Sequence, residues 1–433
     1  MALPRPAGLA LALALCASAV SAADFLKLQG HGGPVMALDV NGTHALTASF
    51  DYSVGYWPLS APEPTWLEGH RAAVNSVIFI DDTTAASGGD DFSVLLWDLG
   101  LGTSQRLEGH KGKIQGLAAH GQMLASASWD GSIGIWNITN ASLIRWLTGH
   151  DSNVNDVAFS ADGATLYSAS SDGTIRQWDM ATGDSRALVR HGFGINQVLV
   201  DNAAGWLAYG ALDGGTRILD LDTGAELADL TAGRRPVLAL ARRPDGGQIA
   251  VGDGEGYIMI VDTTTWRIVH DFRAAVRGPV WALDYTQDGT RLFAAGIDDE
   301  AFAWPLDGAD PATRIGTGER SFLQKPETMS NGERQFARKC SICHTLTPDT
   351  ARRAGPSLHG LFGRRAGTLP GYAYSDALRG ADLIWNDDTI DKLFDIGPDH
   401  YTPGSKMPMQ RIAKAQDRRD LIDYLRSATQ GTD

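Results

Sequence analysis

Cysteine is scarce in this chain of 433 residues, where Cys16, Cys340 and Cys343 are the only three. So few thiols leave room for at most one disulfide bond. Long apolar runs are also lacking beyond residue 22, so no later segment is expected to span a membrane. Positive charge is outnumbered, because 37 Lys and Arg face 51 Asp and Glu and leave a net charge of −14. An acidic surface of this kind disfavours nucleic-acid binding.

The first 22 residues are predicted to be a cleaved signal peptide. Arg5 stands in a short basic segment, an apolar run follows over residues 8–20, and the small residues Ser21 and Ala22 suit signal peptidase. A buried N-terminal helix is the alternative interpretation of the same residues. Cleavage after Ala22 predicts a soluble mature protein in the periplasm, with Cys340 and Cys343 as its only thiols.

Glycine is abundant instead, at 50 residues, which indicates many tight turns. Residues 23–318 repeat with a period near forty, which is typical of propellers. In every repeat an acidic residue precedes the end of an apolar strand by six positions. The seven pairs are Asp51/Trp57, Asp91/Trp97, Asp130/Trp136, Asp172/Trp178, Asp213/Leu219, Glu255/Val261 and Asp298/Trp304.

Each repeat is predicted to form four short strands, and the pattern resembles a WD-repeat propeller. The resemblance implies an all-β propeller of seven blades. In the first four repeats a hydroxyl residue also precedes the acid by four positions, and these residues are Thr47, Ser87, Ser126 and Ser168. In the family this hydroxyl joins a His, an Asp and a Trp in a buried hydrogen-bonded tetrad. The repeat histidines are therefore expected to be structural, since a ring spreads them too far apart to share one metal ion.

Repeats five to seven depart from that pattern, with Tyr209, Val251 and Ala294 in the hydroxyl column. Their turns are expected to depend more on packing. Two segments compete to supply the outer strand of the last blade, residues 25–30 and residues 313–319. The sequence favours residues 25–30, because that segment precedes the first repeat and has no earlier strands of its own.

The stretch "CSICH" at residues 340–344 is the chemical feature of the C-terminal part. A pair of cysteines at this spacing in an exported chain can form a small disulfide, a metal site or a covalent haem site. A dithiol redox centre needs a βαβ context, which the surrounding sequence lacks. A zinc site needs two further ligands, and His359 is one candidate. The histidine directly after the second cysteine favours haem.

The surrounding motifs, "NGERQFARKCSICHTL", "GPSLHGLFGRRAG", "PGYAYSDAL" and "PGSKMPM", resemble a class I cytochrome c of the mitochondrial type over residues 330–428. The resemblance implies a small all-α domain, with residues 319–329 as linker and residues 429–433 as tail. It also implies one covalently attached haem c. Cys340 and Cys343 are then expected to form the thioethers, and His344 and Met407 to ligate the iron.

The same resemblance assigns further residues to the haem. Pro356 is expected to accept the ring N–H of His344 through its carbonyl, and Arg364, Tyr374 and Trp385 are expected to bind the haem propionates. Met409 is a rival ligand to Met407, but in the family the sulfur directly follows the "P-G-x-K" segment. Three pocket positions depart from the family, since Leu378, Leu393 or Phe394, and Met409 replace polar or aromatic residues. The pocket is therefore expected to be less polar than usual.

Two functions are consistent with the sequence. The favoured one is an electron carrier whose propeller is a docking platform for a redox partner protein, because a His/Met pair fills both axial positions on iron. No catalytic residue is assigned, and a carrier is favoured over an enzyme. The alternative is a periplasmic oxidoreductase, quinohaemoprotein-like or of another class, with an active site in the propeller and the haem as electron exit. Residues 325–433 carry 16 Lys and Arg against 14 Asp and Glu, so the acidic excess lies in the first 324 residues.

Overall fold

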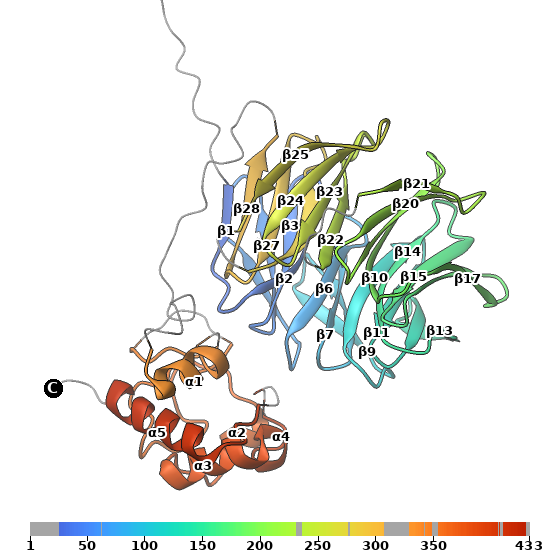
Figure 1. Ribbon diagram of the computed structural model, residues 1–433. Coiled ribbons are helices and arrows are strands. Elements are labelled where there is room, and N and C mark those ends of the chain that lie inside the picture. Colours follow the sequence, from blue (N-terminus) through green and yellow to red (C-terminus); the bar gives the residue numbers. More distant parts are fainter. Residues whose placement is uncertain are drawn as a thin grey trace, which may run out of the picture.

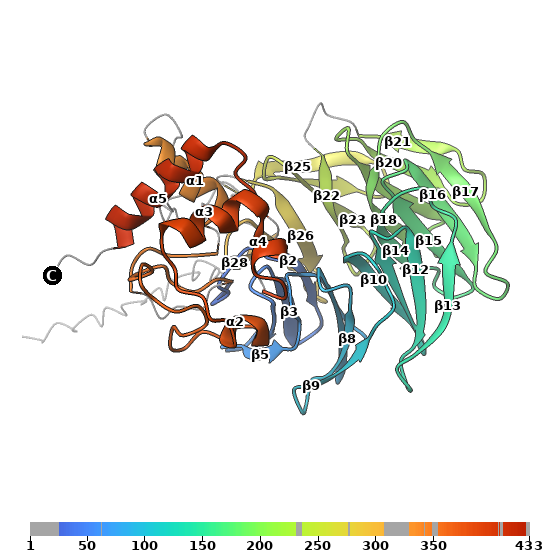
Figure 2. The same ribbon diagram turned by 90° about the horizontal axis from the view of Figure 1, so that it is seen from below.

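The computed structural model describes residues 26–61, 63–230, 236–275, 278–306, 329–341, 343–348, 354–405, 407 and 410–429. The predicted signal peptide and residues 319–328 of the predicted linker lie outside these ranges. Within them the chain forms seven four-stranded antiparallel sheets, followed by a small unit of helices. Figure 1 shows the sheets arranged around a ring, and Figure 2 shows the helical unit beside the sheets that contain β2, β5 and β28.

Each blade uses four consecutive strands, from the inner strand at the ring axis to the outer strand. Blades 1 and 2 comprise β2 (Val35–Val40), β3 (His44–Ser49), β4 (Ser53–Pro58), β5 (Thr65–Glu68), β6 (Val74–Phe79), β7 (Thr84–Gly89), β8 (Val94–Asp98) and β9 (Thr103–Leu107). Blades 3 and 4 comprise β10 (Ile114–His120), β11 (Met123–Ser128), β12 (Ser132–Asn137), β13 (Ser142–Thr148), β14 (Val154–Phe159), β15 (Thr165–Ser170), β16 (Thr174–Asp179) and β17 (Ser185–Arg190). Blades 5 and 6 comprise β18 (Ile195–Asp201), β19 (Trp206–Ala211), β20 (Thr216–Asp220), β21 (Glu226–Asp229), β22 (Val237–Arg242), β23 (Gln248–Asp253), β24 (Tyr257–Asp262) and β25 (Arg267–Arg273).

Blade 7 differs because its outer strand comes from the other end of the propeller sequence. It comprises β26 (Val280–Tyr285), β27 (Arg291–Gly296), β28 (Glu300–Pro305) and β1 (Leu26–Gln29). Strand β1 pairs antiparallel with β28, from Leu26 opposite Ala303 to Gln29 opposite Glu300. The prediction that residues 25–30 close the ring is confirmed, and the competing residues 313–319 lie outside the described part of the chain. The inner strands β26 and β2 also contact each other, which completes the ring.

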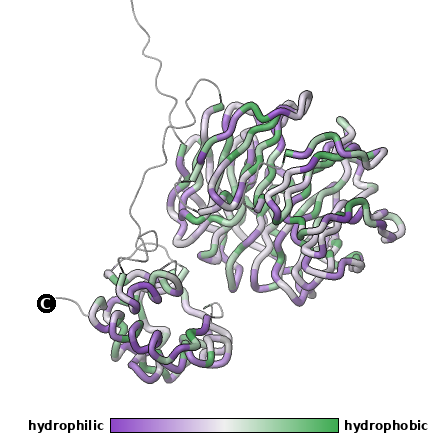
Figure 3. The backbone as a smooth tube through the Cα atoms, in the orientation of Figure 1, coloured by the Kyte–Doolittle hydropathy of each residue, from purple (hydrophilic) through white to green (hydrophobic). Residues whose placement is uncertain are grey.

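The hydrophobic core of the propeller lies between neighbouring blades. Trp57, Trp97 and Trp178 are fully buried there, and each cluster of buried side chains combines strands of two adjacent blades. Figure 3 shows hydrophobic and hydrophilic residues alternating along many strands, as a sheet with two differently packed faces requires. Burial of one large apolar side chain contributes roughly 1.5–3 kcal/mol to stability. No blade can bury these faces by itself, so the ring is stable only as a whole.

The tetrads expected from the family resemblance are present in blades 1 to 4. In blade 3 the indole of Trp136 donates to Ser126 Oγ at 2.8 Å, and Ser126 Oγ lies 2.8 Å from His110 Nε2. A carboxylate only accepts, so His110 Nδ1–H donates to Asp130 at 3.0 Å, and Nε2 of the neutral ring accepts from the Ser126 hydroxyl. The carboxylate of Asp130, whose side chain is 15% exposed, is thereby satisfied. The other tetrads are His31/Thr47/Asp51/Trp57, His70/Ser87/Asp91/Trp97 and His150/Ser168/Asp172/Trp178.

Blades 5 and 6 stabilise the same turn with different polar contacts. In blade 5, Tyr209 occupies the hydroxyl column and His191 contacts Asp213 directly, with 3.0 Å between His191 Nε2 and the carboxylate. In blade 6 the expected acid, Glu255, is exposed. Asp253 is buried instead, and its carboxylate accepts from the backbone N–H groups of Glu255 and Tyr257 at 2.9 Å each. The carboxylate that binds this turn thus belongs to Asp253, two positions before the residue in the acidic column of the repeat.

The described helices form the small C-terminal unit. They are α1 (Asn331–Lys339), α2 (Asp376–Arg379), α3 (Asp387–Ile396), α4 (Pro398–Tyr401) and α5 (Ala415–Thr429). The Ser330 side chain caps α1 by accepting from the backbone N–H of Glu333. Helices α1 and α5 cross where Gly332 lies against α5, and a Cβ there would collide with the backbone oxygen of Asp420.

Apolar side chains of both helices pack together at this junction. The rings of Phe336 on α1 and Tyr424 on α5 are 5.8 Å apart between centroids, and Leu421 and Leu425 are buried beside them. No helix among the described residues is long and apolar enough to cross a membrane.

Candidate functional site

A cavity of about 1070 Å³ lies within the helical unit. All eight residues that the sequence assigned to a haem line it, from three separate parts of the C-terminal sequence. They are Cys340, Cys343, His344, Pro356, Arg364, Tyr374, Trp385 and Met407. The fold thus brings the whole predicted set to one place.

The end of α1 positions both cysteines and the histidine. The backbone N–H groups of Cys343 and His344 donate to the carbonyl of Cys340 at 3.0 and 2.9 Å, which makes a tight turn directly after the helix. Burial raises the pKa of both thiols to about 12. A dithiol redox centre or a thiolate metal site needs a lowered thiol pKa, so the environment disfavours both alternatives. A buried thiol pair facing an apolar cavity is suited to thioether bonds with a bound group.

His344 is held in one orientation by a single hydrogen bond. Its ring Nδ1 donates to the carbonyl oxygen of Pro356 at 2.7 Å, so the hydrogen bond predicted for this pair is present. Burial lowers the pKa of His344, which favours the neutral imidazole. With the proton on Nδ1, the lone pair of Nε2 is available for a metal. The adjacent Gly355 is needed for this approach, because a Cβ there would collide with the His344 ring.

A cation and two aromatic residues lie on another part of the cavity wall. The guanidinium of Arg364 donates to the carbonyls of His359 and Ser357 at 2.9 and 2.8 Å, which fixes its position. Burial partly desolvates the Arg364 charge and lowers the pKa of the guanidinium. A nearby anion would therefore stabilise this charge. Tyr374 and Trp385 line the same cavity. Their binding of carboxylates, and that of Arg364, stays a prediction.

The remaining wall is mostly apolar and includes Met407. Leu378, which departs from the family pattern, lines the cavity, and so do Leu393 and Phe394, the two candidates for a second departure. The rival Met409 lies outside the described residues. Gln410 was missed by the sequence analysis, although it lies three residues after Met407. Its Oε1 atom is buried without a hydrogen-bond partner among the described residues, so the cavity wall has an unmet polar acceptor.

These features fit a flat, largely apolar prosthetic group with an anionic edge. Two buried thiols can attach it, His344 and Met407 offer a nitrogen and a thioether to a metal, and Arg364 offers charge to its anionic edge. His359, the zinc candidate, is not among the residues that line the cavity. Within the described ranges, no group of three or more His, Cys, Asp or Glu side chains could hold a metal ion.

One wall residue comes from the propeller and was also missed. Tyr52, in the turn between β3 and β4 of blade 1, lines the cavity together with Cys343 and Tyr372. A second contact joins the same parts, since the backbone N–H of Ala354 donates to the carbonyl of Gly32 at 3.2 Å. The sequence does hold a signal, because Tyr52 stands where four other repeats have glycine after the acidic residue.

The axis of the propeller contains another cavity, of about 1370 Å³, and four of its polar side chains bind backbone groups of the next blade. The amides of Asn75, Asn155 and Asn196 donate to backbone carbonyls of the next blade at 3.2, 2.9 and 2.9 Å. Asp156 accepts from the backbone N–H of Val198 in blade 5 at 3.0 Å, and burial raises its pKa to about 7. These groups join adjacent blades rather than converging on a common point.

Family models match both parts of the chain. The model described as "WD domain, G-beta repeat" matches residues 62–98, 102–137 and 141–179, and the model described as "Cytochrome c" matches residues 329–429.

Among curated proteins, the chain is similar to cytochrome c of Sesamum indicum, with 43% identity over 104 residues, 24% of this chain and 93% of that protein. It is 42% identical to cytochrome c of Gibberella zeae over 101 residues, 23% of this chain and 94% of that protein. It is 41% identical to cytochrome c of Arabidopsis thaliana over 98 residues, 23% of this chain and 87% of that protein.

Proposed function

The chain belongs to the cytochrome c family through residues 329–429, and on that premise we propose that it is an exported electron carrier with a built-in docking platform. Membership implies a covalently attached haem c, and the chain is therefore an electron-carrying haem protein fused to a seven-bladed propeller. When bound, haem c supplies one-electron chemistry at its iron. The finer proposals concern the iron ligands, the location and the role of the propeller.

For the ligands we propose His344 and Met407. The observation that carries this is the common cavity, which both side chains line together with Cys340 and Cys343. The hydrogen bond from His344 Nδ1 to Pro356 leaves Nε2 as the coordinating atom. When haem c is bound, His344 and Met407 would supply an imidazole and a thioether to its iron, a pair that would favour the ferrous state and leave neither oxygen nor a substrate an open site on the metal. This ligand pair supports a carrier rather than an oxidase.

For the location we propose the periplasm. Its support is the composition of residues 1–22, where a basic segment, an apolar run and small residues follow in the order of a signal peptide. Haem attachment to the two cysteines and export can be tested together. Full-length protein produced in a bacterium with haem c maturation should appear in the periplasmic fraction, begin at Ala23 and keep haem on a denaturing gel. Protein that stays in the cytoplasm, or that releases its haem, would contradict the proposal.

For the propeller we propose binding of a redox partner protein. The axial cavity supports this indirectly, because the side chains of Asn75, Asn155, Asp156 and Asn196 in its wall serve contacts between blades. Binding tethered next to an electron carrier raises the local concentration of the partner.

Cross-linking of the full-length haem protein in periplasmic extract tests the platform. Mass spectrometry should place cross-links to the partner on the propeller as well as on residues 329–429. Cross-links confined to residues 329–429 would remove the platform from the proposal. Oxidation of a small organic substrate by the purified chain alone would favour an enzyme instead.

A further inference from the structure

The turn between the second and third strands of a blade contains one residue in the left-handed region of backbone space. In blades 3 to 6 this residue is a glycine, at positions Gly131 (φ 85°), Gly173 (φ 79°), Gly214 (φ 84°) and Gly256 (φ 89°). In blades 1 and 2 it is an aromatic residue, Tyr52 at φ 73° and Phe92 at φ 62°. A bulky L residue is strained in this region, whereas glycine is not. Strain of this kind persists only where the surrounding structure holds the residue in place.

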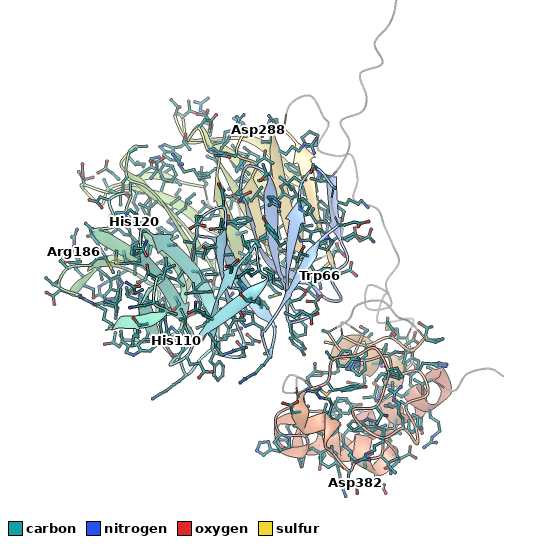
Figure 4. All side chains as sticks on the ribbon, turned by 180° about the vertical axis from the view of Figure 1, so that it is seen from behind. Trp66, His110, His120, Arg186, Asp288 and Asp382 are labelled. Atoms are coloured by element: carbon teal, nitrogen blue, oxygen red, sulfur yellow. The ribbon has the colours of Figure 1, made fainter. Side chains whose placement is uncertain are left out.

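The two aromatic side chains have different surroundings. Phe92 is 46% exposed, whereas Tyr52 is 8% exposed and lies in the wall of the cavity. Tyr372 and Cys343 are its electrostatic neighbours there, and burial raises the pKa of Tyr52 well above its usual value. The helical unit lies beside blade 1, and Figure 4 shows Trp66 of that blade on the part of the propeller nearest the helices. The haem-binding unit therefore covers Tyr52 and not Phe92.

A second contact connects the propeller to the loop that orients His344. The carbonyl of Gly32 accepts from the backbone N–H of Ala354 at 3.2 Å, and the carbonyl of Ala354 accepts from the hydroxyl of Tyr372 at 2.5 Å. Two residues later, the carbonyl of Pro356 accepts from His344. Ala354 itself is 2% exposed. The segment that fixes the histidine is thus bound by the propeller at its other end.

The tetrad of blade 1 adjoins both contacts with the helical unit, those made by Tyr52 and by Gly32. The carboxylate of Asp51, the residue before Tyr52, accepts from the backbone N–H of Gly32 at 2.7 Å. The side chain of Asp51 is fully buried, whereas the corresponding Asp91, Asp130 and Asp172 side chains are 6%, 15% and 10% exposed. The most buried of the four tetrads is therefore the one that carries the contact with the helical unit.

We propose that Tyr52 is a residue of the haem site and that its ring excludes water from the side of the site where Cys343 lies. The packing of the propeller against the helical unit then controls how much solvent reaches the haem. The inference rests on the proposed electron-carrier function and adds a positioning residue from outside the cytochrome c domain. Solvent access and local polarity control the potential of a haem, because water stabilises the more highly charged oxidised state. Close packing of the propeller against the helical unit therefore favours the reduced haem.

Three full-length variants test the proposal on the haem-loaded protein. Tyr52→Gly removes the ring and restores the residue that four other blades use, so the turn should fold with less strain. Phe92→Gly makes the same change in the neighbouring blade, away from the cavity. Tyr52→Phe keeps the ring and removes only the hydroxyl. The readouts are the midpoint potential, the rate of reduction by ascorbate and the hydrogen exchange of the Ala354 amide.

The expected result is specific to Tyr52→Gly. At a fixed ambient potential its ratio of oxidised to reduced haem should rise several-fold. A tenfold rise corresponds to a midpoint potential lower by about 59 mV. Reduction by ascorbate should accelerate several-fold, and the Ala354 amide should exchange faster as its bond to Gly32 opens. Phe92→Gly and Tyr52→Phe should match the wild-type protein in all three measurements.

Two outcomes would overturn the proposal. Equal potentials and equal exchange rates in Tyr52→Gly and Phe92→Gly would show that the propeller does not close the haem site. A Tyr52→Phe variant as altered as Tyr52→Gly would show that the ring does not act by excluding water. In either case a normal haem c spectrum would leave the electron-carrier function intact. Wild-type protein without covalent haem would instead overturn the proposed function itself.

Discussion

At the scale of single residues, hydrogen bonds decide which atom of a side chain remains available. Pro356 takes the Nδ1 proton of His344, and this leaves Nε2 for a metal. The guanidinium of Arg364 donates to the carbonyls of His359 and Ser357, and these hydrogen bonds fix it at the cavity wall. The side chains of His344 and Arg364 are therefore held by backbone groups before any prosthetic group binds, which lowers the cost of ordering them.

The first prediction concerns the ligand opposite His344. Met407→Ala should lower the potential and let cyanide or carbon monoxide bind within seconds, because the thioether that favours ferrous iron is lost. Stopped-flow spectroscopy and a redox titration measure both effects. Met409→Ala is the matched control and should keep the low-spin spectrum. If Met409→Ala loses that spectrum and Met407→Ala keeps it, the two methionines have been assigned the wrong way round.

At the scale of secondary-structure elements, the tetrads join the strands of blades 1 to 4. Each tetrad ties the loop before the inner strand to the turn between the second and third strands, through a His and an Asp about twenty residues apart. Blade 6 has no hydroxyl in that column, and the Asp253 carboxylate accepts from backbone N–H groups of its turn. The blades therefore have the same strand pairing but different polar cores.

The second prediction removes one tetrad hydroxyl. Ser126→Ala should lower the free energy of unfolding by about 1–3 kcal/mol, because the buried donor of Trp136 and the ring nitrogen of His110 lose their shared partner. Urea unfolding of the propeller, followed by far-ultraviolet circular dichroism, measures it. Ser104→Ala at an exposed position of β9 is the control and should change stability by less than about 0.5 kcal/mol. A loss in Ser126→Ala no larger than in the control would show that the tetrad is not stabilising.

The third prediction concerns acid. Burial by itself would raise the pKa of Asp172, but hydrogen bonds from Thr174 and His150 outweigh burial and lower it to about 2. Because the pKa is lower in the folded state than in the unfolded state, this carboxylate stabilises the fold above about pH 4. That stabilisation is lost as the pH falls from about 4 to about 2.

Unfolding of wild-type protein and of Asp172→Asn, measured at several pH values between 2 and 6, tests this sign. The stability difference between the two proteins should be largest near pH 6 and shrink towards pH 2. A difference that stays constant with pH would contradict the lowered pKa. Ser104→Ala again serves as the control, because it changes no ionisable group.

At the scale of the whole molecule, the two parts differ in what completes their cores. The propeller core consists of side chains shared between blades. The core of the helical unit surrounds a cavity of about 1070 Å³, and Cys340, Leu393 and Met407 belong both to that core and to the cavity wall. The helical unit therefore lacks much of its packing until a prosthetic group fills it, whereas the propeller does not.

The fourth prediction follows from this difference. Cys340→Ala/Cys343→Ala in the full chain should lose covalent haem and lower the unfolding temperature of the helical unit by many degrees, since binding stabilises only the folded state. The propeller transition should shift little. Calorimetry of the variant and of the wild-type protein separates the two transitions, and Phe92→Gly is the control that leaves both thiols in place. One shared transition that shifts as a unit would show that the parts unfold together.

The sequence by itself determined the elements whose signals are local. Seven repeats, the tetrad of each of the first four blades and the cysteine–histidine motif all follow from residue types at short, fixed spacings. Local spacing fixes these features because each depends on one turn of chain or one strand pairing. Even the closing strand β1 was predictable, since residues 25–30 had no earlier strand to pair with.

Only the tertiary structure decided the contacts between distant segments. Tyr52 and Cys343 are 291 positions apart, and no spacing rule indicates that they line one cavity. The same holds for Gly32 and Ala354, and for Gln410, whose unmet acceptor depends on what surrounds it. The choice of Asp253 over Glu255 was also tertiary, because the direction of each side chain decides which carboxylate is buried. Such contacts depend on how folded surfaces fit together. In the sequence they are visible only as a departure from the repeat pattern, such as a tyrosine in place of glycine.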